Sequence, residues 1–286
     1  MRLIEENRAC KIIYNFIKSN NITGKVLLPA NVCHDVVDTL LYAGLSVQFI
    51  DISMDTYCVD EEQICQYIDD ARVLLYVHTY GIEKNYTQKF NKFCELNPNL
   101  IIIDDKCLCL PCFHNNEICV DLELYSTGEK KQVDLGVGGF AYIADKWNYF
   151  DCLEGKHHIL FDDNIYKYSS DLTTEIIKIK SHKEKLNKIY RESLPKEIQL
   201  PDEYQNWRFN ILVENKELIL KTLFENRLFA SNHYKSYISK CSNANLLHNK
   251  IINLFNDLYY TEQQAIETCE IIKKIINTND KNTKNK

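Results

Sequence analysis

The chain has 286 residues, of which 45% are hydrophobic and 26% are charged, which excludes a disordered, collagen-like or coiled-coil chain and leaves room for one large or two ordinary domains. The net charge of -6 gives no general attraction to phosphate backbones or anionic membranes, so no nucleic-acid or membrane partner is expected. No apolar run approaches the roughly 18 residues of a membrane span, and acidic residues follow Met1 where a signal peptide is apolar. These features predict a cytoplasmic protein with reduced cysteines.

The first half alternates between short apolar runs and amphipathic segments of helical spacing. The apolar runs predict strands at 25–29, 46–50, 72–78, 100–104, 120–125 and 139–143. The amphipathic segments predict helices at 33–44, 59–69 and 86–96, after a first helix with Asn7 as its N-cap. Because strands joined by helices run parallel, residues 1–150 are expected to form a large α/β domain with a mainly parallel sheet sandwiched by helices.

The alternation stops near Asp145, where a second unit is expected to begin. The patterns that follow predict helices at 172–194, 216–226, 244–254 and 261–276 and a strand at 206–213. Residues 151–276 should therefore contain a linker helix and a small C-terminal α+β domain. Residues 277–286 are rich in Asn, Lys and Thr and are expected to form a disordered tail.

The most informative stretch runs from Leu124 to Ala141, where a predicted strand leads to Ser126, two lysines and a glycine cluster. Four of the eight glycines of the chain lie here, which indicates unusual backbone angles or a close approach to a ligand. A lysine between a phosphate-binding serine and such glycines suits covalent attachment of pyridoxal phosphate. A hairpin loop with two solvated lysines is the alternative interpretation.

Two carboxylates, Asp104 and Asp105, lie at the end of a very apolar predicted strand. Ligands of open α/β sheets bind at the carboxyl ends of the strands. A carboxylate there can pair with a protonated pyridine nitrogen, which makes the ring an electron sink. The alternative is an Asp pair that caps the next turn.

Four segments of the sequence carry a resemblance to a known family: Asn7-Arg8-Ala9-Cys10, Leu28-Pro29-Ala30-Asn31-Val32-Cys33, Ile103-Asp104-Asp105 and the loop from Ser126 to Gly139. They resemble the DegT/StrS-type aminotransferases, which use pyridoxal 5'-phosphate, have the aspartate aminotransferase fold (PLP-transferase fold type I) and mostly act on sugars carried by nucleotides. The loop spacing Ser-x4-Lys-x4-Gly-x-Gly-Gly is the most specific part of the likeness.

The resemblance implies a role for individual residues. Lys131 would be the Schiff-base lysine and the general acid/base, and Asp105 would pair with the pyridine nitrogen. Cys33 or the adjacent His34 would lie against the face of the ring. The cofactor-binding residues that it implies are Arg8, Ala9, Cys33, His34, Asp105, Ser126 and Lys131.

The same resemblance implies an enzyme that moves an amino group from a donor such as glutamate to a keto acceptor. The acceptor would be a small molecule, with a nucleotide-linked keto sugar of surface polysaccharide biosynthesis as the usual case in the family. A homodimer is also implied, because the active sites of this fold lie between two subunits. The family's Gly-x-Asn-x-Arg segment has its nearest counterpart at 164–167, and the usual amino-terminal segment before the first helix is expected to be absent.

Three other interpretations remain open from the sequence. The protein could keep the fold without catalysis and act as a binding or assembly partner of a related enzyme. An elimination reaction is disfavoured by Lys131, because the deoxysugar dehydratases that the chain resembles have His there. A zinc site is disfavoured by the spacing of the thiol and imidazole cluster, which does not follow the usual paired pattern; the cluster comprises Cys107, Cys109, Cys112, His114 and Cys119.

Overall fold

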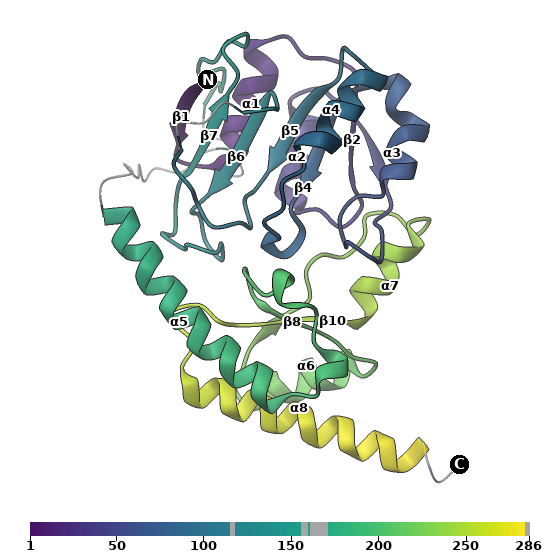
Figure 1. The fold of residues 1–286 in the computed structure, drawn as a ribbon, viewed down its shortest axis with the longest axis vertical. Helices are drawn as coiled ribbons and strands as arrows, with labels where there is room; N and C mark the ends of the chain where they lie inside the picture. The colour runs from purple at the N-terminus through teal and green to yellow at the C-terminus, as the bar shows by residue number, and fades with distance from the viewer. Residues whose placement is uncertain (115–117, 156–159, 161–170, 284–286) are drawn as a thin grey trace.

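The computed structural model describes residues 1–114, 118–155, 160 and 171–283. Figure 1 shows two stacked units, which we call the large domain (1–155) and the small domain (171–283). The large domain contains a seven-stranded sheet in the order β1-β7-β6-β5-β4-β2-β3. Its strands are β1 (Arg2–Glu6), β2 (Lys25–Pro29), β3 (Ser46–Ile50), β4 (Ala71–Val77), β5 (Ile101–Asp105), β6 (Leu122–Ser126) and β7 (Gly139–Ile143).

The five strands from β3 to β6 run parallel, whereas β7 and β1 close one edge in antiparallel pairs. Alternate residues of the central strands face opposite sides, so Leu75 and Ile103 join one core and Leu74 and Ile102 the other. Helices α1 (Ala9–Ser19) and α2 (His34–Tyr42) cover the first face, and α3 (Glu61–Tyr67) and α4 (Thr87–Leu96) cover the second. The predicted α/β sandwich with a mainly parallel sheet is therefore confirmed.

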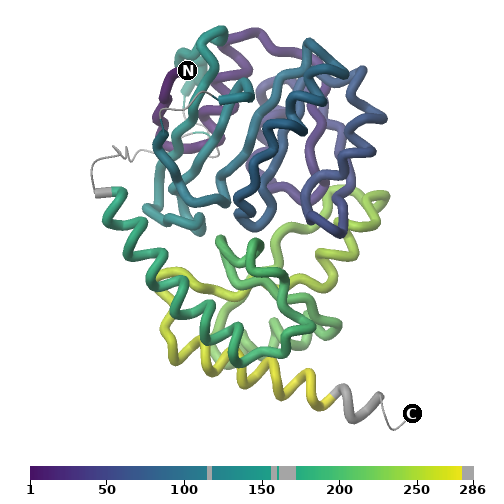
Figure 2. The backbone as a smooth tube through the Cα atoms, in the orientation of Figure 1, coloured from purple at the N-terminus to yellow at the C-terminus, as the bar shows by residue number. Residues whose placement is uncertain are grey.

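The small domain has a core of its own between two long helices and a three-stranded antiparallel sheet in the order β8-β10-β9. The strands are β8 (Phe209–Leu212), β9 (Ala230–Ser231) and β10 (Ile251–Leu254). The helices are α5 (Asp171–Ser193), α6 (Lys216–Glu225), α7 (Ser242–Lys250) and α8 (Glu262–Thr283). Figure 2 shows α7 next to the large domain and α8 at the opposite end of the small domain.

Four local predictions differ from the structure. The helix predicted at 244–254 ends at Lys250, because the apolar residues after it pair as β10 between β8 and β9. The amino-terminal strand β1 was not predicted and pairs with β7. Arg8, not Asn7, is the N-cap of α1. The last helix continues from the predicted end at Ile276 to Thr283, since no Gly or Pro interrupts it, so the predicted tail is helical over 277–283.

Candidate active site

The amino terminus of α1 is packed against the loop from Ser126 to Gly139, which we call the glycine loop. A Cβ atom on Gly139 would lie 2.7 Å from the backbone N and Cα of Ala9, so only glycine permits this approach. The Gly138 amide donates to the Asn7 carbonyl at 2.8 Å. The N-cap Arg8 makes no side-chain hydrogen bond to the helix. No side-chain cap therefore occupies the start of α1, where the positive end of the helix dipole can attract an anion.

The turn between Ser126 and Gly136 brings both of its lysines to the cavity lining, where Lys130 is more exposed than Lys131. The Gly128 amide donates to Ser126 Oγ at 3.3 Å, and the Lys131 amide donates to the Gly128 carbonyl at 3.3 Å. Lys130 has a φ of 62°, which non-glycine residues rarely adopt, and is exposed. Lys131 is half-buried and lines the same cavity as Ser126.

A second set of contacts holds this turn from inside the loop. One oxygen of Asp134 accepts a hydrogen bond from the Lys130 amide at 2.8 Å, and the other accepts one from the Gly136 amide at 2.9 Å. Gly136 itself has a φ of 77°, the left-handed region that favours glycine. Of the four glycines predicted to need unusual backbone angles or a close approach, Gly136 and Gly138 have a positive φ, and Gly139 makes the close approach to Ala9.

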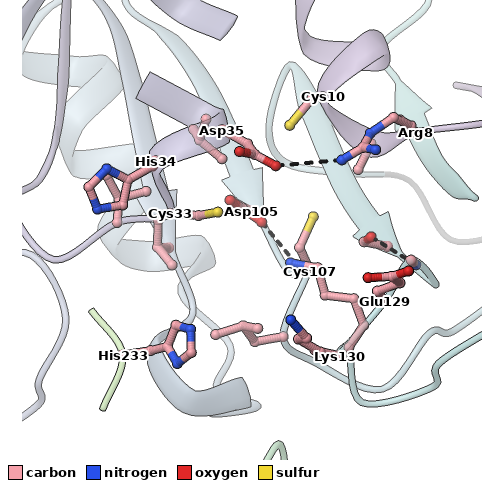
Figure 3. A pocket seen from close by; sticks show the side chains of 18 of the residues that line it. Arg8, Cys10, Cys33, His34, Asp35, Asp105, Cys107, Glu129, Lys130 and His233 are labelled. Carbon is pink, nitrogen blue, oxygen red and sulfur yellow. Dashed lines mark hydrogen bonds and ion pairs between the residues drawn. The ribbon is translucent and has the colours of Figure 1, made fainter. Parts of the chain in front are cut away.

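Asp105 and Asp104 face opposite sides of the sheet, as successive residues of a strand do. Asp105 is buried, lines the cavity and accepts a hydrogen bond from the Cys107 amide at 2.9 Å. Figure 3 shows its carboxylate between Cys33 and Cys107. Asp104 instead binds the buried His78 ring at 2.7 Å on the other face. The structure thus assigns different environments to two carboxylates that are adjacent in sequence.

The electrostatic environment of Lys131 keeps its amine protonated. Burial by itself lowers the pKa of a lysine, but the groups that face Lys131 outweigh it and the pKa lies above the ordinary value. These groups are, in order of effect, Tyr234, Cys107, Cys33 and Asp105. Near neutral pH an ammonium at Lys131 therefore faces the carboxylate of Asp105.

Cys33 and His34 both line the cavity, and their side chains diverge. Cys33 lies beside Asp105 (Figure 3). The ring of His34 is 4.6 Å from that of Tyr237 in the small domain. The neighbouring Asp35 forms an ion pair with Arg8 at 3.5 Å, which connects the start of α2 to the start of α1. Of the two residues predicted to lie against a ring, Cys33 is the one next to Asp105.

The structure brings all seven predicted site residues to one cavity of about 690 Å³: Arg8, Ala9, Cys33, His34, Asp105, Ser126 and Lys131. They come from the starts of α1 and α2 and from the carboxyl ends of β5 and β6. Ligands of open α/β sheets bind at such an edge. The roles of these residues stay predictions, whereas their proximity is a feature of the fold.

The opposite wall of the cavity belongs to the small domain and was not predicted. It contains Trp207, Asn232, His233, Tyr234, Lys235 and His248. Burial, together with nearby cations that include Arg208 and Lys130, lowers the pKa of His233 to about 4. This wall therefore presents a neutral imidazole among cationic side chains near neutral pH.

These donors fit pyridoxal phosphate, a group with an aldehyde, a pyridine nitrogen and a phosphate. A helix start without a side-chain cap, next to Ser126, suits the phosphate. Lys131 could bond to the aldehyde carbon, and Asp105 offers the charge that a pyridinium nitrogen pairs with. The close contact of Gly139 with Ala9 keeps the phosphate-binding and lysine-bearing segments together.

The cysteine and histidine cluster has separate environments in the described chain. Cys107 lines the cavity, Cys109 is buried, and Cys112 and Cys119 are exposed. His114 pairs with Glu123 at 2.9 Å. Across the described residues, no three His, Cys, Asp or Glu side chains are grouped as metal ligands would be. The counterpart of the Gly-x-Asn-x-Arg segment, at 164–167, lies outside the described residues.

A model of the DegT/DnrJ/EryC1/StrS aminotransferase family matches residues 9–147, which span α1 to the end of the glycine loop and β7. This segment is similar to that family. The resemblance predicted from the lysine loop and the strand-end Asp is thereby confirmed for the large domain. A comparison with curated proteins found no match to the chain.

Solved structures of DegT-type proteins share the fold over nearly the whole chain. DesI, determined in the presence of its TDP-sugar product, is 15% identical, with 95% of this chain and 80% of that chain covered and a TM-score of 0.74. PseC from Helicobacter pylori, an aminotransferase involved in the biosynthesis of pseudoaminic acid, is 14% identical, with 96% and 86% covered and a TM-score of 0.71.

A third relative carries the cofactor. The E. coli GDP-4-keto-6-deoxy-D-mannose-3-dehydratase, determined with bound hydrated PLP, is 12% identical, with 95% of this chain and 87% of that chain covered and a TM-score of 0.67. At such identities the likeness establishes the fold alone. The DegT-type fold nevertheless extends through both domains, beyond the segment that the family model matches. None of the helices in the described chain is long and apolar enough to cross a membrane.

Proposed function

We propose that this protein is a pyridoxal-phosphate-dependent aminotransferase that transfers an amino group from an amino acid to a keto acceptor. The observation that carries the proposal is the position of Lys131, which lies in one cavity with Asp105 and with the uncapped start of α1. The family match over residues 9–147 supports the same chemistry. The cofactor supplies an electron sink that stabilises negative charge at the carbon next to the transferred nitrogen.

Lys131 anchors the cofactor and moves protons at its Nζ atom. The side chain can act as both nucleophile and general acid/base because it reaches the cavity from a turn that is fixed by Asp134. Its raised pKa favours the ammonium form, whereas acceptance of a proton at Nζ would need the neutral amine. Attachment requires the minor, neutral form of the amine.

Asp105 and the start of α1 hold the two ends of the cofactor. The carboxylate of Asp105 is kept in place by the Cys107 amide and keeps a ring nitrogen protonated. Ser126 and the start of α1 would bind the phosphate. The small-domain wall lies on the other side of the cavity and would limit the access of water to the reacting atoms.

A nucleotide-linked keto sugar is the acceptor that the relatives favour. DesI was determined with a TDP-sugar product, and PseC acts in the biosynthesis of pseudoaminic acid. The cavity of about 690 Å³ is large enough for a cofactor together with a substrate. Glutamate as donor, a role in surface polysaccharide assembly, a cytoplasmic location and a homodimer stay predictions from the family resemblance.

The test is the absorbance spectrum of the purified protein with pyridoxal phosphate, measured for the wild type and for Lys131→Ala. A lysine adduct absorbs at about 410 to 430 nm, and addition of an amino donor shifts the band to about 330 nm if the amino group is transferred. We expect the first band in the wild type alone, and the shift after glutamate. Absence of the band in the wild type would refute the enzyme and favour a protein that keeps the fold as a binding partner.

A further inference from the structure

A tryptophan of the small domain is hydrogen-bonded to the backbone of the turn that carries Lys130 and Lys131. The indole Nε1 of Trp207 donates a hydrogen bond to the carbonyl oxygen of Lys130 at 2.7 Å. Trp207 is 3% exposed and lines the cavity. The bond joins residues that are far apart in the sequence and belong to different domains.

The accepting carbonyl belongs to the peptide plane that ends at the Lys131 nitrogen. The other polar group of the same plane, the Lys131 N–H, donates to the Gly128 carbonyl at 3.3 Å. Since a peptide unit is rigid and planar, fixing both polar groups fixes the position of the Lys131 Cα atom, from which the side chain starts. Lys130 has a left-handed conformation that non-glycine residues disfavour, so the turn needs such restraints to keep its shape.

Trp207 is itself held from two sides. Its amide donates to the Tyr80 carbonyl of the large domain at 3.3 Å, and its carbonyl accepts a hydrogen bond from the buried Lys183 ammonium at 2.8 Å. The Arg208 guanidinium lies 5.2 Å from its ring centre, and the His233 ring meets it edge-on at 5.7 Å. Because these contacts hold Trp207 in place, its hydrogen bond can restrain the position of the turn at Lys130.

We propose that Trp207 is a positioning residue for Lys131, which orients the lysine toward the cofactor aldehyde from across the domain boundary. The proposal rests on the proposed cofactor role of Lys131. Trp207 acts through the Lys130–Lys131 peptide and takes no part in proton transfer. Its loss should therefore slow attachment at Lys131 while the fold and the reactivity of exposed lysines stay the same.

The experiment uses the full chain, freed of cofactor, as wild type and as Trp207→Phe, which keeps a ring in place and removes the N–H. Each protein is mixed with pyridoxal phosphate, reduced with borohydride at increasing times, and analysed by mass spectrometry for modification at each lysine. Loss of one hydrogen bond, worth about 1 kcal/mol, should slow modification of Lys131 about fivefold. Modification of exposed lysines such as Lys188 should proceed at the wild-type rate.

The chain offers a matched control in its other tryptophan. Trp147 donates a comparable hydrogen bond, Nε1 to Asp121 at 2.8 Å, in the large domain outside the cavity lining. Trp147→Phe should leave the rate at Lys131 unchanged. Equal rates at Lys131 in Trp207→Phe and the wild type would overturn the inference, and a wild type unmodified at Lys131 would refute the proposed function and the inference with it.

A second measurement does not depend on the stability of Trp207→Phe. In wild-type protein labelled with ¹⁵N-tryptophan, the two indole N–H signals are assigned with Trp147→Phe. Reduction of the cofactor onto Lys131 should shift the Trp207 signal and leave the Trp147 signal in place. A Trp207 signal that does not move when Lys131 is modified would also overturn the inference.

Discussion

The Asp51 carboxylate caps a helix of the other domain, because its Oδ1 atom accepts a hydrogen bond from the Ala244 amide at 2.9 Å. Its Oδ2 atom accepts one from the Asn243 amide at 3.0 Å. Both amides lie in the first turn of α7, whose own N-cap residue, Cys241, makes no side-chain hydrogen bond to the helix. The end of β3 thereby anchors the small domain and helps to set the position of the cavity wall.

Replacement of Asp51 by alanine should loosen the contact between the domains. Loss of a helix cap costs about 1 to 2 kcal/mol, and here the cost falls on the packing of α7 against the large domain. We expect a lower midpoint in urea unfolding and separate transitions for the two domains. Asp60→Ala is the control, since Asp60 caps α3 within the large domain and its loss should leave the transitions coincident.

Gly139→Ala should move the glycine loop away from the start of α1. The added Cβ would meet the Ala9 backbone at 2.7 Å, and overpacking of this kind costs about 1 to 3 kcal/mol. Pyridoxal phosphate should bind more weakly, as measured by titration of the absorbance band. Gly44→Ala strains a left-handed residue that has open space around it, and it should lower stability without changing cofactor affinity.

Asp105→Asn tests the charge on the cavity floor while keeping the shape of the side chain. Because the phosphate is held elsewhere, at the start of α1, we expect the cofactor to remain bound and the turnover to fall about a hundredfold. Transfer kinetics with saturating donor measure this loss. Asp104→Asn is the adjacent control, and it should reduce stability through the weakened His78 contact more than it reduces turnover. Similar turnover in both variants would contradict the assignment.

The raised pKa of Lys131 predicts how cofactor attachment depends on pH. Only the neutral amine attacks an aldehyde, and below the pKa its fraction grows tenfold per pH unit. The attachment rate should therefore increase throughout the neutral range without reaching a plateau. Burial opposes this shift, and the Asp105 carboxylate is one of the groups that raise the pKa of Lys131. Asp105→Asn should accordingly lower the pKa of Lys131 and speed attachment at a fixed pH.

Lys183 predicts an unusual pH dependence of stability. Burial, reinforced by the Arg208 charge and opposed by Asp257, lowers the pKa of Lys183 to about 7. Between that pKa and the unfolded value of about 10.4, the unfolded chain binds more protons than the native one, so native stability rises with pH. The free energy of unfolding rises by at most about 1.4 kcal/mol per pH unit in this range. Below the native pKa, Lys183 is protonated in both states and its effect on stability no longer changes with pH.

Urea unfolding at several pH values, compared with Lys183→Met, checks this dependence. The free energy of unfolding of the wild type, relative to that of the variant, should increase as the pH increases above about 7. Lys185→Met removes an exposed lysine from the same helix, and its difference from the wild type should not change with pH. A constant difference between the wild type and Lys183→Met would contradict the prediction.

The sequence by itself determined six of the seven strands of the large sheet and the residues of the candidate site. Period-two and helical patterns are local, so the strands at Lys25–Pro29 and Ile101–Asp105 could be predicted from their own residues. The spacing of Ser126, Lys131 and the glycines is also a local pattern, because these residues form a single turn. That turn reverses the chain and presents the Lys131 amine. Neither pattern depends on distant parts of the chain.

The tertiary structure decided which of these residues act together and what faces them. Strand β10 was predicted as helix because a short apolar run has no periodicity that separates the two, and its pairing with β8 and β9 settled its conformation. Adjacent carboxylates acquired different surroundings through the pleat of β5. The bond from Trp207 to Lys130 depends on the packing of two domains, a long-range contact that no local pattern in the sequence encodes.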